Sequence, residues 1–114
     1  MITFHDYEWE VNKACFYPSA NQGTLEALVY GALGMGGETG EVVEKIKKVW
    51  RDKAGVFSEE DKEAIAKELG DVLFYLTRVA NELEYSLEEI AEMNVKKFLA
   101  RKENGTLQGE GDNR

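Results

Sequence analysis

The sequence has little of the chemistry on which many small proteins depend, with one cysteine, one histidine and one proline in 114 residues. The single Cys15 excludes an internal disulfide framework and a cysteine-ligated metal site. The single His5 excludes a metal site built from several histidines of one chain. Long apolar runs are also missing, and the start of the chain lacks the basic-then-apolar pattern of a secretory signal. We therefore expect a cytoplasmic protein with no membrane partner.

Basic residues are scarce relative to acidic ones, with 14 Lys and Arg against 22 Asp and Glu, which gives a formal net charge of −8. This balance excludes a nucleic-acid polymer as partner, because binding to a long phosphate backbone requires clusters of Lys and Arg. A small anion could still bind if metal cations lay between it and the carboxylates. The length and the 43% content of hydrophobic residues predict one small domain, 1–114, with a modest core.

Stretches rich in Ala, Leu, Glu and Lys predict an all-α fold, and no segment shows convincing strand alternation. A short helix is expected to begin after Thr3 and to end before Pro18. Turn residues and capping patterns then delimit three long helices within 23–103, at about 24–52, 58–84 and 86–103, followed by a polar, glycine-rich tail at 104–114. Such long helices bury little within so short a chain. We expect an antiparallel helical bundle that homo-oligomerisation completes, as a homodimer or a homotetramer.

Two of the predicted helices carry acid pairs at the edge of their apolar stripes. At 100° per residue, Glu68 lies inside the stripe of its helix and Asp71 at the edge, and Glu38 and Glu41 show the same relation on the preceding helix. Residues three apart share a helix face, so each pair could hold one ligand. Two facing pairs would repel each other unless a hard cation, Mg²⁺ or Mn²⁺, lay between them. The alternative is that these acids lie on solvated helix faces.

Five glycines, at positions 31, 34, 36, 37 and 40, fall within one predicted helix. Each is expected to cost about 1 kcal/mol relative to Ala in a helix interior, so the cluster calls for a reason. Either another helix or a ligand approaches closely here, or the helix is kinked or broken near Gly36 and Gly37.

The last predicted helix carries polar residues in or beside its apolar stripe, namely Asn94, Lys97 and Arg101. An amide and two cations in that position could bind phosphate oxygens or the edge of a base. For Arg101, a salt bridge to an acid of a neighbouring helix is an equal alternative.

A basic patch lies late in the second predicted helix, at Lys45, Lys47, Lys48 and Arg51. This patch fits a solvated helix face. Contact with phosphates is the alternative.

The residues around the acid pairs resemble a known family. The run GETGEVVE at 37–44 contains the first acid pair, Glu38 and Glu41, and the run ELGD at 68–71 contains the second, with residues 42–67 between the two pairs. This arrangement is similar to the E-x-x-E, spacer, E-x-x-D signature of the MazG-like nucleotide pyrophosphohydrolases. The stretches GETGEVVEKIKK and KELGDVLFYL and the Asn94-x-x-Lys97 spacing continue the likeness. The GEGD sequence at 109–112 is similar to one branch of small family members. The resemblance covers roughly residues 25–114.

The resemblance implies an all-α, usually dimeric or tetrameric enzyme that uses Mg²⁺ to hydrolyse a nucleoside triphosphate to the monophosphate and pyrophosphate. Either Glu41 or Glu38 would activate the attacking water, and Lys97 and Arg101 would stabilise charge on the phosphates. By position, the family's metal ligands would be Glu38, Glu41, Glu68 and Asp71, and its nucleotide contacts Asn94 and Lys97.

Two other functions remain open at this point. The chain could be a non-enzymatic, acidic helical interaction module, or a MazG-like scaffold that binds nucleotide or metal without turnover. A ferritin-like di-iron protein is excluded, because no Glu of this chain is followed three residues later by His.

Overall fold

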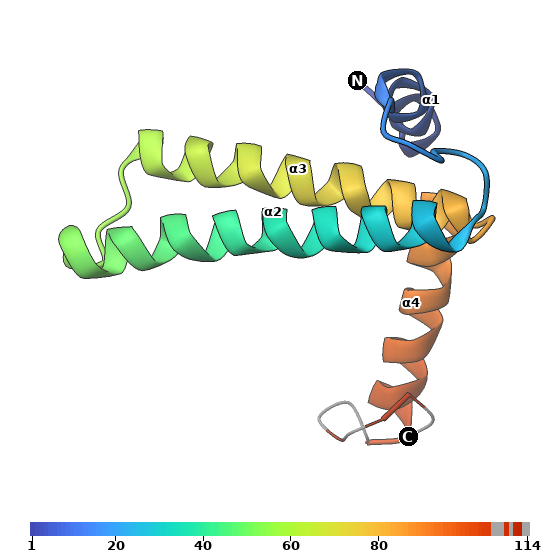
Figure 1. Ribbon diagram of the computed structural model, residues 1–114. Coiled ribbons are helices and arrows are strands. Elements are labelled where there is room, and N and C mark those ends of the chain that lie inside the picture. The colour runs from blue at the N-terminus through green and yellow to red at the C-terminus, as the bar shows by residue number, and fades with distance from the viewer. Residues whose placement is uncertain (106–108, 110, 113–114) are drawn as a thin grey trace.

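A computed structural model describes residues 1–105, 109 and 111–112, and these residues form four α-helices and no strand (Figure 1). The helices are α1 (Phe4–Ala14), α2 (Leu25–Asp52), α3 (Glu59–Glu82) and α4 (Leu87–Glu103). The predicted all-α class is therefore confirmed, and α3 ends two residues before its predicted end at Glu84. The predicted tail at 104–114 lies partly outside the described residues, as does Glu110 of its GEGD sequence. No helix in the described part of the chain is long and apolar enough to cross a bilayer.

Hydroxyl side chains fix the start of every helix. At each N-cap, the side chain accepts a hydrogen bond from the backbone N–H three residues further on, which satisfies one of the helix's unpaired donors. In three cases the third residue's carboxylate also accepts a bond from the N-cap backbone N–H, which completes a capping box. These boxes are Thr3–Asp6, Ser58–Asp61 and Ser86–Glu89, and α2 begins with the simpler cap of Thr24.

Helices α2 and α3 form a long antiparallel pair (Figure 1). Two glycines let the backbone of α2 approach α3 closely. A Cβ atom added at Gly31 would lie 3.0 Å from a methyl group of Val79, and one added at Gly34 would lie 2.5 Å from the ring of Tyr75. Close approach of another helix is thus confirmed for these two glycines. The alternative of a broken helix is wrong, because α2 is continuous from Leu25 to Asp52.

A buried polar network fastens α1 and the loop after it to the end of α3. The side chain of Arg78 is fully buried and donates hydrogen bonds of 3.0 Å to both the Tyr17 hydroxyl and a Glu82 carboxylate oxygen. The remaining bonds of the network run from Arg78 to Asn12, and from the backbone N–H groups of Asn21 and Gly23 to Glu82. Sequence reasoning did not identify this network.

The core of a single chain is small and its shape is extended. The radius of gyration is 16.9 Å, whereas a compact domain of this length is expected at about 13 Å. Helix α4 projects from the end of the α2–α3 pair, and of its described residues only Leu87 is buried (Figure 1). Large apolar side chains such as Leu33 and Trp50 are 72% and 76% exposed. One chain therefore leaves much apolar surface without a packing partner.

Candidate functional site

Three carboxylates from facing turns of α2 and α3 lie together near the middle of the helix pair. Oxygens of Glu38, Glu68 and Asp71 all lie within 4.8 Å of one another. Because Mg²⁺ binds oxygen ligands at about 2.1 Å, small side-chain rotations would bring these oxygens around one ion. The structure thus brings together three of the four residues that the sequence predicted as metal ligands.

The fourth predicted ligand, Glu41, lies outside this group of close oxygens. Glu41 is exposed and lies one turn further along α2 than Glu38. Its negative charge nevertheless acts on Glu38 and helps to raise the pKa of that carboxyl. Glu41 therefore lies close enough to belong to the site without being one of the three converging carboxylates.

The negative charges of the neighbouring carboxylates lie close enough to act on Glu38. Partial burial raises the pKa of Glu38 above its ordinary value, and the negative charges of Asp71, Glu68 and Glu41 raise it further. The effect extends to two phenols. Burial and then the charge of Asp71 raise the pKa of Tyr7, and burial together with Tyr30 and the nearby acids raises that of Tyr75. This is the electrostatic environment in which a bound cation would be stabilised.

One lysine partly balances this charge. The ammonium of Lys45 on α2 lies 3.6 Å from a carboxylate oxygen of Glu68 on α3, and among the ion pairs of the described residues this is the one that reaches the three carboxylates. The sequence placed Lys45 in a basic patch and gave no sign that it pairs with the acids. A single, loosely held ammonium leaves the group with a clear excess of negative charge.

The donor set fits a hard divalent cation. All three converging groups offer carboxylate oxygen, which Mg²⁺ and Mn²⁺ prefer, and no sulfur or imidazole ligand is among them. Their excess charge is what a divalent ion would neutralise.

The hollow that contains the predicted nucleotide contacts of α4 is lined by none of the three converging carboxylates of the described residues. Asn94 and Lys97 line a hollow of about 220 Å³ on α4, together with Ile90 and Met93. The Lys97 ammonium lies 2.9 Å from a carboxylate oxygen of Asp112 in the tail.

The third predicted contact on α4 also pairs with the tail. Arg101 lies 3.3 Å from the same Asp112 carboxylate and donates a 3.2 Å hydrogen bond to the Gly111 carbonyl. The partner of Arg101 is thus an acid of the tail and not of a neighbouring helix. Together, Lys97 and Arg101 lower the pKa of Asp112.

Comparison with known proteins places this arrangement in a family. Residues 32–106 match the MazG nucleotide pyrophosphohydrolase domain, and this segment contains both acid pairs. The chain belongs to the MazG family. The suspected resemblance is therefore confirmed.

Two relatives show how far the likeness to MazG proteins extends. The chain is 38% identical over 109 residues to the Gene 37 protein of Mycobacterium phage L5, covering 95% of this chain and 96% of that protein. It is 37% identical over 75 residues to the uncharacterized protein YpjD of Bacillus subtilis strain 168, covering 65% of this chain and 67% of that protein. No solved structure matches the chain.

An aromatic hollow lies mostly on residues that precede the MazG match. It has a volume of about 120 Å³, and the rings of Tyr17 and Tyr30 stack in it with centroids 4.3 Å apart. Tyr75 completes one side, and its ring packs against Gly34, one turn before Glu38 on α2, so the hollow lies close to the acids. Sequence reasoning missed this hollow, because its rings come from two helices and a loop.

Proposed function

We propose that this MazG protein hydrolyses nucleoside triphosphates to the nucleoside monophosphate and pyrophosphate, with Mg²⁺ as cofactor. The observation that supports this most strongly is the convergence of Glu38, Glu68 and Asp71 from two helices. A triphosphate is strongly anionic, so a site of this charge can accept it only through bound cations. The proposed substrate and the proposed cofactor therefore depend on each other.

In this proposal, Glu38, Glu68 and Asp71 hold the ion, with Glu41 as a further ligand. The set contains only oxygen donors, so Mn²⁺ could replace Mg²⁺. When bound, such an ion neutralises phosphate oxygens and makes a nearby water easier to ionise.

The chain's own carboxylates would handle the proton of the attacking water. Glu41 is exposed and lies outside the three converging oxygens, so one of its oxygens is available to accept this proton. Glu38 is the second candidate, because it lies one turn from Glu41 on the same helix. A glutamate oxygen in this position also orients the water toward the phosphate.

We also propose that the active form is a homodimer or homotetramer. One chain exposes an apolar groove of about 340 Å³ on α2. Exposed apolar patches of this kind mark surfaces at which proteins associate. The α4 contacts Asn94, Lys97 and Arg101 would then bind phosphates or a base in the assembled protein. The groove is lined by Leu25, Glu26, Val29, Tyr30 and Leu33.

The test is an assay of purified protein against ribo-, deoxy- and modified nucleoside triphosphates, with and without MgCl₂. We expect release of pyrophosphate and of the monophosphate in equal amounts, and only with the metal. Release of inorganic phosphate and a diphosphate nucleotide would contradict the proposed bond cleavage. An interaction module should show neither turnover nor a shift of the melting temperature with MgCl₂, whereas a binding-only scaffold should show the shift alone.

A further inference from the structure

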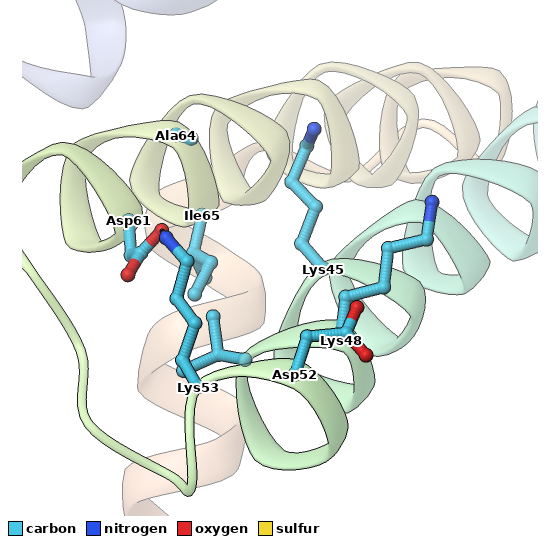
Figure 2. Close-up of a pocket in the computed structure, with 8 residues that line it drawn as sticks. Lys45, Lys48, Asp52, Lys53, Asp61, Ala64 and Ile65 are labelled. Atoms are coloured by element: carbon cyan, nitrogen blue, oxygen red, sulfur yellow. Dashed lines mark hydrogen bonds and ion pairs between the residues drawn. The ribbon is translucent and has the colours of Figure 1, made fainter.

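A second charged hollow lies along the same two helices, toward the loop that joins α2 and α3. It has a volume of about 220 Å³ (Figure 2). Three lysines, Lys45, Lys48 and Lys53, and two acids, Asp52 and Asp61, are among its lining residues. Its floor is apolar and is formed by Val49, Ala64 and Ile65. Lysines therefore outnumber acids among its lining residues, although the chain has a formal charge of −8. We call it the lysine hollow.

The lysine hollow is continuous with the acid site through one side chain. Lys45 lines the hollow, and its ammonium also lies 3.6 Å from Glu68, one of the three converging carboxylates. Along α2, Lys45 lies two turns from Glu38, which corresponds to about 10 Å of helix axis. A ligand that begins at the acids and extends along the groove between α2 and α3 would therefore reach Lys45 next and Lys48 after it.

The lysines of the hollow differ in how firmly they are paired. Lys53 lies 2.7 Å from Asp61, and Figure 2 shows its side chain reaching across to that carboxylate. Lys45 and Lys48 have only long pairings, of 3.6 Å to Glu68 and 3.7 Å to Glu44. Pairs this long and this exposed contribute little, so both ammonium groups can exchange these partners for a more highly charged anion. Lys53, by contrast, is held in place by its short ion pair with Asp61.

We propose that the lysine hollow binds the terminal diphosphate of the substrate and retains it as pyrophosphate after cleavage. This inference rests on the proposed function. Water adds its oxygen to the α- or the β-phosphorus and gives a proton to Glu41 or Glu38, while the anhydride bond between these two phosphates breaks. Pyrophosphate carries the bridging oxygen after attack at the α-phosphorus and the added oxygen after attack at the β-phosphorus. Lys45 and Lys48 donate charge-assisted hydrogen bonds to its oxygens. Lys45 moves to the diphosphate from Glu68 when that carboxylate holds a cation.

The direct test measures binding of sodium pyrophosphate in the presence of MgCl₂ by isothermal titration calorimetry. Lys45→Met and Lys48→Met remove the ammonium groups and keep most of the apolar stems. The matched control is Lys47→Met, because Lys47 lies between them in sequence, is 49% exposed in its side chain, pairs with Glu44 at 2.8 Å and does not line the hollow. All three variants lose one charge, so they change the overall field of the protein equally.

We expect Lys45→Met and Lys48→Met each to weaken pyrophosphate binding by about tenfold, as for the loss of one charge-assisted hydrogen bond. Lys47→Met should change it less than twofold. Binding of nucleoside monophosphate, which lacks the diphosphate, should be the same in all three. The proposal is overturned if Lys47→Met weakens binding as much as the other two, or if none of the three has an effect.

A second measurement is expected to show tighter binding by a lysine variant, in contrast to the weaker binding of pyrophosphate. The Lys45 ammonium competes with a cation for Glu68, so Lys45→Met should bind Mn²⁺ more tightly than the wild type when no phosphate is present. Lys47→Met should leave Mn²⁺ binding unchanged. Weaker or unchanged Mn²⁺ binding by Lys45→Met would contradict the exchange between metal and diphosphate. Neither measurement requires turnover, so a protein that binds pyrophosphate at these lysines and cleaves no nucleotide would overturn the proposed function alone.

Discussion

The ring of Tyr75 on α3 packs directly against the backbone of Gly34 on α2, so closely that a Cβ atom at Gly34 would lie 2.5 Å from the ring carbons. Glu38 lies one turn beyond Gly34, and its charge helps to raise the pKa of Tyr75. This contact therefore sets the separation of the two helices immediately beside the acid site.

Gly34→Ala should force the helices apart and lower the free energy of unfolding by about 1–3 kcal/mol, as overpacking does elsewhere. Gly36→Ala is the matched control, because a Cβ atom there meets nothing within 4 Å. The control should stabilise α2 by about 0.5–1 kcal/mol, since Ala has the higher helix propensity. Urea denaturation of both variants measures the two effects. Equal stabilisation by both substitutions would show that the contact with Tyr75 places no limit on the helix separation.

The buried network around Arg78 should be the most sensitive point of the fold outside the site. Arg78→Ala leaves the Glu82 carboxylate, whose side chain is 1% exposed, without its ion-pair partner, and should cost about 3–5 kcal/mol of stability. Lys13→Ala breaks the exposed pair of Lys13 with Glu10 and should cost less than about 1 kcal/mol. Thermal and urea denaturation would compare them. Similar small losses in both variants would mean that the network contributes little to anchoring α1.

The capping box at the start of α3 should make stability depend on pH. A hydrogen bond from Lys53 and one from the Ser58 backbone lower the pKa of Asp61 from 3.8 to about 2. A pKa lowered in the folded state means that the ionised form stabilises the fold. This contribution is complete above pH 3.8 or so and is lost as the pH falls through about 2.

Asp61→Asn should therefore be less stable than the wild type at pH 7, and the difference should shrink between about pH 4 and pH 2. Urea midpoints measured at several pH values across this range test the expectation. Glu59→Gln, which removes an acid with an 88% exposed side chain from the same turn, should show a much smaller difference. A wild-type advantage that persists unchanged at pH 2 would contradict the assignment to Asp61.

Local signals were sufficient to predict the helix starts and most of the acid site. Thr3, Ser58 and Ser86 are each followed three residues later by an acid, and each forms a capping box. The placement of Glu38 and Glu68 at the apolar stripes was equally local, because helical periodicity alone determines it. Consecutive antiparallel helices then bring such positions together.

Contacts that depend on tertiary geometry could not be predicted in this way. The hydrogen bond between Arg78 and Asn12 joins residues far apart in sequence, and no spacing rule connects them. The pairing of Lys45 with Glu68 depends on the exact register of α2 against α3. The projection of α4 away from the helix pair depends on the short connection before Leu87, whose angle the periodicity of either helix does not encode.

The most direct test of the central claim compares Mg²⁺-dependent pyrophosphate release by the wild type, Glu68→Gln and Glu63→Gln. Glu68 is one of the three converging carboxylates, whereas Glu63 on the same helix has a 71% exposed side chain and pairs with Lys67. We predict metal-dependent release by the wild type and by Glu63→Gln, and a loss of at least about a hundredfold in Glu68→Gln with the fold retained by circular dichroism. Near-normal turnover by Glu68→Gln would contradict the assignment of the acids as the metal-binding centre of the enzyme.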